Sequence, residues 1–526
     1  MPWSIDYRVG LSLVSSVIVA CLITNLKRKR LPRPPGPTAL SLLPTLLGLD
    51  KVDPWVTYTQ WQAVYGDLIY VKLLNQNFII INSEMTTKDL LEKRSRNYSD
   101  RPFIATLEPF GWAFNFAFYR YGDEWRACRR LFHQCFQAKA AMNLRPMQLS
   151  KARQLLDNLH DEPQNYVAHI ATYSASIAMS AVYDYEVAPR GDPVVAILEK
   201  ALYLGVKVMT PERAFILSVF PFLMRLPVWF PGATIKRDAL LSRKHVSDMV
   251  ETPFKYAQKN AASGTAAPSL VSGFLGGIES GDEARQFGKV LKYTSSTAFG
   301  GAWETTSSIL QVFVLAMVLY PAVQERARAE IDAVVERDRL PNFDDRPSLP
   351  YIDAILRETL RWQPVAPLGV AHSASGDDVY EGYFIPRGST IIANVWAMSF
   401  DERRYPNASE FVPERFLAPD GELTSDDPAG FVFGFGRRAC PGRYTADASL
   451  WAAIAAMLAT FEFWKDKDAQ GQDVEFVPTF TNGLTRCPLP FPCRIISRPL
   501  DAALRVPTLP SPRHDQSVRQ DFVESS

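Results

Sequence analysis

Cysteine and net charge are both scarce in this chain of 526 residues. The six cysteines form no CxxC pair, so they resemble neither a zinc site nor the disulfide framework of a secreted protein. Reduced thiols in a domain that faces the cytosol fit this pattern best. The 57 Lys and Arg residues nearly balance the 56 Asp and Glu residues, which gives no support to nucleic-acid binding. Linker-like stretches are also lacking inside the chain, and we expect one large domain.

The first 30 residues have the pattern of a membrane anchor. Residues 9–26 are mostly apolar, and at ~1.5 Å per residue they reach about one hydrocarbon core. Four basic residues follow at 27–30, which predicts a lumenal N-terminus and a cytosolic body. A cleaved signal peptide is disfavoured because Asp6 and Arg8 cancel ahead of the apolar run. The same orientation would leave the sequons at Asn97 and Asn407 without sugar.

We therefore expect an anchor over residues 1–30, a stiff proline-rich hinge over residues 31–37 and a domain over residues 38–500. Residues 501–526 are rich in proline, serine and charge, and we expect them to be disordered. Within the domain, residues 68–82 predict two strands joined by a polar turn at 75–77, and residues 390–395 predict another strand.

Cys440 lies in a loop rich in glycine and arginine, with the sequence Phe-Gly-Phe-Gly-Arg-Arg-Ala-Cys-Pro-Gly over residues 433–442. The charges of Arg437 and Arg438 are expected to lower the pKa of its thiol. Glycines permit tight turns and let a flat ligand approach the backbone. A helix that starts near Gly442 would add further stabilisation of negative charge. The loop thus predicts a thiolate that ligates a metal.

Three other patterns carry chemistry. Residues 290–320 predict a long helix ended by Pro321, in which Glu304 and Thr305 place an acid beside a hydroxyl, as proton delivery requires. On a second helix, Glu358 and Arg361 share one face, and Arg415 follows in the sequence Pro-Glu-Arg-Phe at 413–416. On a third, Trp125 and Arg129 are four residues apart and share a face.

These motifs, in this order, resemble those of the cytochrome P450 family. The match to its haem-binding signature, Phe-x-x-Gly-x-Arg-x-Cys-x-Gly, is carried by Phe433, Gly436, Arg438, Cys440 and Gly442. Residues 301–306 resemble its oxygen-activation motif, with the departure that Ala302 stands where glycine is usual. The resemblance implies haem b with Cys440 as the axial ligand, catalytic proton delivery by Thr305 and Glu304, and an ion triad of Glu358, Arg361 and Arg415. It also implies propionate contacts from Trp125, Arg129, His372 and Arg438.

The implied fold is mainly α, a large helical domain with a small β-rich region, preceded by one transmembrane helix. The sequences of residues 229–232, 382–386 and 487–493 resemble those of fungal microsomal members that tailor secondary metabolites, of the O-methylsterigmatocystin oxidoreductase and tryptamine hydroxylase types. Such a protein would sit in the endoplasmic reticulum membrane as a single-pass protein facing the cytosol. It would oxidise an apolar, polycyclic or terpenoid-like molecule with dioxygen and with electrons from a separate NADPH–cytochrome P450 reductase.

Three alternatives stay open at this point. The chain could oxidise xenobiotics or aromatics broadly, act as a haem-thiolate isomerase or peroxygenase without a reductase, or sense a gas or ligand without catalysis. The acid–threonine pair favours a monooxygenase. The apolar, proline-broken residues 215–231 argue against a sensor and predict membrane contact. The aromatic residues at 106–119 either line a substrate pocket or pack into the core. A group of arginines either docks a reductase or is simply exposed to solvent, and its members are Arg126, Arg130, Arg437 and Arg443.

Overall fold

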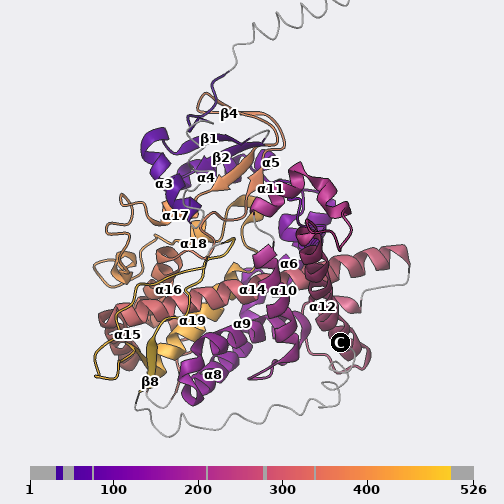
Figure 1. Ribbon diagram of the computed structural model, residues 1–526. Helices are drawn as coiled ribbons and strands as arrows, with labels where there is room; N and C mark the ends of the chain where they lie inside the picture. The colour runs from indigo at the N-terminus through magenta and orange to yellow at the C-terminus, as the bar shows by residue number, and fades with distance from the viewer. Residues whose placement is uncertain are drawn as a thin grey trace, which may run out of the picture.

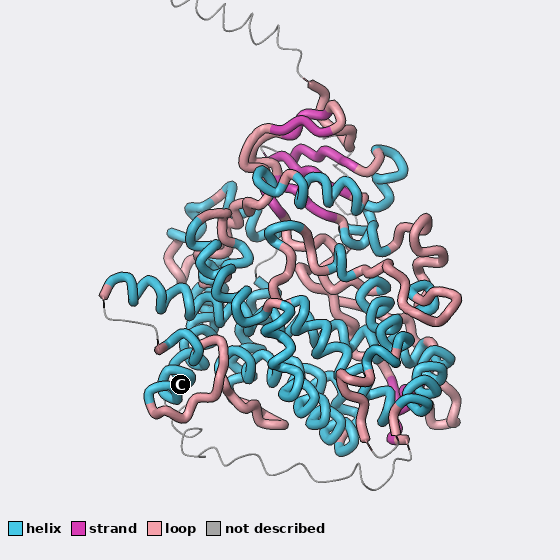
Figure 2. Tube along the Cα trace, turned by 180° about the vertical axis from the view of Figure 1, so that it is seen from behind, coloured by secondary structure: helices cyan, strands magenta, loops and turns pink. Residues whose placement is uncertain are grey.

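The computed structural model describes residues 31–38, 53–73, 76–208, 211–276, 281–336, 339–481 and 483–498. The predicted anchor and tail lie outside the described residues. Most strands gather at one end of the molecule, a separate pair of strands lies at the opposite end, and helices fill the rest (Figures 1 and 2). The mainly helical fold with a small β region is therefore confirmed.

The helices account for most of the core. Their bounds are α3 (Pro54–Tyr65), α4 (Glu84–Lys88), α5 (Ser95–Tyr98), α6 (Asp123–Phe136), α7 (Ala138–Ala141), α8 (Arg145–Asp161), α9 (Tyr166–Tyr183), α10 (Pro193–Val208), α11 (Pro211–Val219), α12 (Thr234–Ala262), α13 (Ser272–Leu275), α14 (Asp282–Leu319), α15 (Pro321–Val334), α16 (Pro350–Trp362), α17 (Val395–Ser399), α18 (Ala429–Val432) and α19 (Arg443–Thr460).

The strands form small sheets. Their bounds are β1 (Leu68–Leu73), β2 (Gln76–Ile81), β3 (His372–Ser373), β4 (Asp378–Tyr380), β5 (Tyr383–Ile385), β6 (Thr390–Ala393), β7 (Phe461–Lys465) and β8 (Cys493–Ser497). One sheet has the order β1-β2-β6-β3, with β2 and β6 parallel. The predicted strand pair is confirmed, but the turn is shorter than predicted, because Gln76 and Asn77 already pair with Leu73 and Lys72.

Helix α14 crosses the middle of the molecule (Figure 1). Its 38 residues reach ~57 Å at 1.5 Å per residue, and it begins eight residues earlier than the apolar pattern predicts because its first turns are polar. It ends at Leu319 since Pro321, at the first turn of α15, cannot continue the hydrogen-bond ladder. Among the described helices, α14 alone is long and apolar enough to cross a membrane, but 72% of its apolar window is buried inside the protein. It is a core helix.

The aromatic segment at 106–119 packs into the core. Phe110, Trp112, Phe114 and Phe116 are buried in one cluster with α9, α12 and the first half of α14. The backbone N–H of Phe116 also donates to the Thr297 hydroxyl on α14, at 3.3 Å. Core packing therefore explains these four rings, and they form an aromatic wall against the helix that carries Glu304.

Candidate active site

The Cys440 loop is held in shape by its own backbone. The amide of Cys440 donates to the Phe433 carbonyl at 2.7 Å, which closes the loop. Gly434 and Gly436 have φ of 76° and 56°, in the left-handed region that favours glycine. Helix α19 begins at Arg443 with Gly442 as its N-cap, so the helix predicted near Gly442 is confirmed. The sulfur therefore lies beside a helix N-terminus.

The charges that act on the Cys440 thiol come from residues other than those the sequence suggested. Burial raises the pKa of Cys440, while the backbone amide of Gly442 and the charges of Arg129 and Arg443 lower it. The prediction that Arg437 and Arg438 supply this charge is wrong. Arg437 donates to the Tyr121 hydroxyl at 2.6 Å, and Arg438 turns to the other side of the loop. Arg437 and Arg438, although adjacent in the sequence, therefore contact different parts of the protein.

Arg438 lies between α6 and the sheet end of the molecule. Its guanidinium stacks over the indole of Trp125, with 4.3 Å from Cζ to the ring centroid. Nε donates to the Ser99 carbonyl at 2.8 Å and Nη2 donates to the Tyr119 carbonyl at 2.7 Å. Its Nη1 is buried and has no hydrogen-bond acceptor among the described residues. A buried donor of this kind calls for an anionic partner.

His372 and Arg101 lie in the same surroundings. The Nδ1 atom of His372, on β3, is 2.7 Å from the Tyr98 carbonyl. Burial and then the charge of Arg101 hold the pKa of His372 well below its usual range, so its imidazole is neutral. Arg101 donates to the carbonyls of Val370 and Ala371, and burial and then the charge of Arg438 lower its pKa to about 9. Sequence reasoning missed Arg101, because no local motif marks it.

The acid–hydroxyl pair lies on an unbroken stretch of α14. The Thr305 hydroxyl donates to the Gly301 carbonyl one turn earlier, at 2.8 Å. The helix continues through Ala302, and a Cβ at Gly301 would meet no atom within 4 Å. Glu304 accepts a hydrogen bond from the Thr485 hydroxyl, and burial raises the pKa of its carboxyl. Ala302 therefore leaves the threonine's contact with the first glycine of the motif intact.

The ion triad forms in full. Glu358 and Arg361 are fully buried and joined by two hydrogen bonds of 2.7 and 2.8 Å, and Arg415 lies 3.2 Å from the same carboxylate. Arg361 also donates to the carbonyls of Ser399, Ala408 and Glu410. Because the charges are paired and the remaining donors are satisfied, the triad fastens α16 to residues 399–415.

Comparison with known proteins settles the family. The sequence matches the family model described as Cytochrome P450 over residues 34–489. The chain belongs to the cytochrome P450 family.

Its curated relatives are fungal monooxygenases. Cytochrome P450 monooxygenase ple1 of Rhodocybe pseudopiperita is 37% identical over 94% of both chains. Cytochrome P450 monooxygenase claR of Ampulloclitocybe clavipes is 34% identical over 94% of this chain and 91% of its own. Tryptamine 4-monooxygenase of Psilocybe cyanescens is 36% identical over 92% of this chain and 97% of its own. The family and these relatives make this chain a monooxygenase.

Members of the cytochrome P450 family bind haem through a cysteine thiolate, and the residues present fit that group. Cys440 is the thiol that would ligate the iron, beside a helix N-terminus and two arginines. The unpartnered Nη1 of Arg438 fits a propionate carboxylate, and Arg129, Trp125 and His372 surround the same region. When bound, haem supplies the activation of dioxygen. The protein supplies the thiolate ligand and the cationic surroundings.

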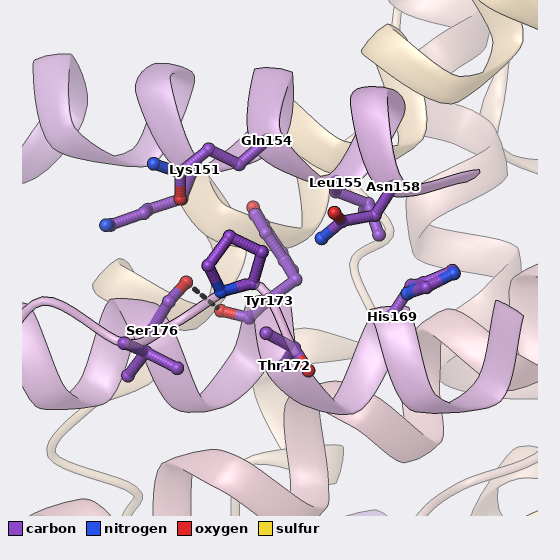
Figure 3. Close-up of a pocket in the computed structure, with 10 residues that line it drawn as sticks. Lys151, Gln154, Leu155, Asn158, His169, Thr172, Tyr173 and Ser176 are labelled. Atoms are coloured by element: carbon purple, nitrogen blue, oxygen red, sulfur yellow. Dashed lines mark hydrogen bonds between the residues drawn. The ribbon is translucent and has the colours of Figure 1, made fainter. Parts of the chain in front are cut away.

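Two cavities bear on the site. A cleft of about 490 Å³ is lined by Tyr121, Trp125, Arg129, Arg130, His133, Gln134, Gly436 and Arg437, so it joins α6 to the Cys440 loop. A crevice between α8 and α9 is lined by Lys151, Gln154, Leu155, Asn158, His169, Thr172, Tyr173 and Ser176 (Figure 3). Its volume of about 10 Å³ holds at most one water, which excludes it as a substrate site for this cytochrome P450.

Proposed function

We propose that this monooxygenase oxidises an apolar, polycyclic or terpenoid-like small molecule in fungal secondary metabolism. In the overall reaction, one dioxygen atom enters a C–H bond of the substrate as hydroxyl. The other leaves as water, with two electrons and a hydride-derived proton from NADPH and one proton from solvent. The observation that carries the proposal is the Glu304–Thr305 pair on α14, because this reaction consumes protons at the buried site and the other haem-thiolate reactions do not need the pair.

The surroundings of α14 support an apolar substrate. Ala302 and Trp303 on this helix are only partly buried, and they border the buried aromatic cluster of Trp112, Phe114 and Phe116. Aromatic and small apolar side chains favour flat, weakly polar ligands. The names of the relatives add support for secondary metabolism, since one of them acts on tryptamine by name. Indoles therefore belong among the substrates to be tested.

The electron donor we propose is NADPH–cytochrome P450 reductase, docking at the face around the 490 Å³ cleft. The Cζ atoms of Arg126 and Arg437 lie 5.4 and 5.3 Å from the centroid of the Tyr121 ring. Arg130, on the same helix as Arg126, is exposed. A cluster of positive charge beside the Cys440 loop suits an acidic flavoprotein.

The location we propose is the endoplasmic reticulum membrane, with a single-pass anchor and a cytosolic domain. The basic residues at 27–30 support this orientation. Exposed apolar side chains at the end of α11 and after it support a second contact with the bilayer, and they are Val219, Phe220, Phe222, Val228, Trp229 and Phe230. Trp229 is 79% exposed, which is costly in water and favourable at a membrane interface.

The test is product analysis in microsomes that contain the chain and a fungal reductase. NADPH and labelled dioxygen are supplied with terpenoids, indoles, polyketides and polycyclic aromatics. One labelled oxygen in a single narrow product class is the expected result. Oxidation spread over many unrelated aromatics would favour detoxification instead. A thiolate-type carbon monoxide spectrum without any labelled product would reopen the isomerase and sensor alternatives.

A further inference from the structure

The carboxyl of Glu304 needs a partner outside its own motif. Successive residues on an α-helix point about 100° apart, so Glu304 and Thr305 do not face each other. The Thr305 hydroxyl is also engaged with the Gly301 carbonyl, at 2.8 Å. The motif on α14 therefore supplies an acid and a hydroxyl but does not orient the acid.

That partner comes from the far end of the chain. The hydroxyl of Thr485 donates to Oε1 of Glu304. A second contact links the same two segments, since the Cys487 thiol lies against the Ser308 hydroxyl, one helical turn after Glu304. Ser308 in turn donates to the Glu304 carbonyl at 2.7 Å. One face of α14 is thus matched to both Thr485 and Cys487.

The segment that carries Thr485 is itself fixed. Two hydrogen bonds close the loop between Thr481 and Cys487. The Thr481 amide donates to the Cys487 carbonyl at 2.8 Å, and the Cys487 amide donates to the Thr481 hydroxyl at 3.0 Å. On the side away from α14, the amide of Arg486 donates to the Val365 carbonyl at 2.7 Å. The Arg486 guanidinium lies 3.7 Å from the centroid of the Phe480 ring and donates to Gln363. Thr485 is therefore held in place from outside the site.

Charged groups do not compete with Thr485 for the acid. Burial raises the pKa of Glu304 and the Thr485 hydroxyl lowers it, while no Lys, Arg or His of the described chain contributes to the shift. The Cys487 thiol faces Glu304, but burial raises its pKa to about 11 and keeps it neutral. The acid accordingly depends on one neutral hydrogen bond rather than on an ion pair.

We propose that Thr485 is a positioning residue. Its hydroxyl holds the proton-donating carboxyl of Glu304 in one orientation, on the side of α14 that faces Thr485 and Cys487. This inference rests on the proposed monooxygenase function, because it assigns Glu304 a proton to deliver. Glu304 is the catalytic residue that gives up the proton, and Thr485 acts through it by fixing its carboxyl and favouring its ionised form. Loss of the Thr485 hydroxyl releases the carboxyl without removing it.

The experiment compares Thr485→Val, which removes the hydroxyl, with Thr485→Ser, which keeps it. Thr481→Val is the matched control, because it weakens the same segment but does not touch Glu304. The first readout is the infrared band of the Glu304 carboxyl in the resting, haem-loaded protein, assigned by its loss in Glu304→Gln and titrated with pH. The midpoint is expected to rise by about one pH unit in Thr485→Val, since the lost bond favoured the charged form, and to stay near wild type in the other two.

The second readout is the share of NADPH electrons that leaves as hydrogen peroxide. It is expected to rise several-fold in Thr485→Val and to return in Thr485→Ser, with no further rise when Thr485→Val is added to Glu304→Gln. An unchanged infrared midpoint in Thr485→Val, an equal shift in Thr481→Val, or no band lost in Glu304→Gln would overturn the proposal. The infrared titration needs neither substrate nor reductase. A shifted midpoint without any oxygenated product therefore supports the positioning by Thr485 while counting against the proposed function.

Discussion

Gly436 lies directly against the backbone carbonyl of Leu91, so close that a Cβ on Gly436 would come within 2.1 Å of that oxygen. Leu91 belongs to a π-helical turn at Asp89–Lys93, far from the Cys440 loop in the sequence. The loop that carries the thiol thus closes onto a turn of the N-terminal part of the domain. Glycine is required at 436 for two reasons, the contact and a φ of 56°.

Gly436→Ala is expected to abolish haem-thiolate binding, because the carbonyl of Leu91 cannot yield 1 Å without displacing its helical turn. The matched control is Gly388→Ala, which also has a positive φ of 77° but would meet no atom within 4 Å. Strain alone costs about 1–2 kcal/mol there, and haem loading should persist. The intensity of the thiolate-type carbon monoxide spectrum per mole of protein measures haem loading in both variants. Equal spectra from the two variants would contradict the steric explanation.

Glu358→Gln is expected to lower the free energy of unfolding by about 3–5 kcal/mol, because two buried arginines lose their counter-charge. Glu475→Gln is the control: its carboxylate pairs with Lys465 at 2.7 Å but is 77% exposed, and surface pairs contribute about 0–1 kcal/mol. Urea unfolding of the haem-loaded proteins compares them. Similar denaturation midpoints for both variants would show that the buried triad is not what secures α16.

The stability of the protein should fall with rising pH through Glu304. Burial raises the pKa of this carboxyl above 4.5, so the folded chain binds the proton more tightly than the unfolded chain does. The stability linked to Glu304 is therefore present below pH 4.5 and is lost as pH rises through the folded pKa. Glu304→Gln has no such proton. Its melting temperature, relative to that of the wild type, should therefore rise as the pH increases from 4.5 through the folded pKa of Glu304. A difference in melting temperature between Glu304→Gln and the wild type that stays constant with pH would contradict a raised pKa.

The elements that the sequence predicts well are those with local signals. Pro321 ends α14 as predicted, and the helix predicted near Gly442 forms as α19, since capping and periodicity act over a few residues. The ion triad is equally accessible, because Glu358 and Arg361 lie one turn apart on one helix. Its partner Arg415 follows in a recognisable motif.

The contacts that escape the sequence are those between distant segments. Thr485 meets Glu304 across 181 positions, and Arg438 meets Ser99 across 339. Arg129 acts on the Cys440 thiol from α6, together with the nearby Arg443, because α6 packs beside the Cys440 loop. No spacing rule encodes such convergence. It follows only from how helices and loops pack, which is also why Arg101 and the π-helical turn at Leu91 were not anticipated.

The proposed membrane anchor and its orientation can be tested at Asn407. This sequon is exposed at the surface of the domain, so a glycosyltransferase could reach it if the domain were lumenal. We expect the full chain to show no mass change after treatment with a glycosidase specific for N-linked sugars. The comparison is a variant whose basic residues at 27–30 are moved ahead of residue 9, which should invert the chain and yield sugar at Asn407. Sugar on the unaltered chain would contradict a cytosolic domain.

The most direct test of the account is the yield of oxygenated product per NADPH consumed by Thr305→Ala, measured beside the wild type and Thr306→Ala, whose side chain is buried. If Thr305 and Glu304 deliver protons for dioxygen cleavage, Thr305→Ala keeps its haem-thiolate spectrum and consumes NADPH but loses most of its product to hydrogen peroxide. Thr306→Ala should remain close to the wild type. An unchanged product yield per NADPH in Thr305→Ala would contradict the central claim, that this chain is a monooxygenase that delivers protons from α14.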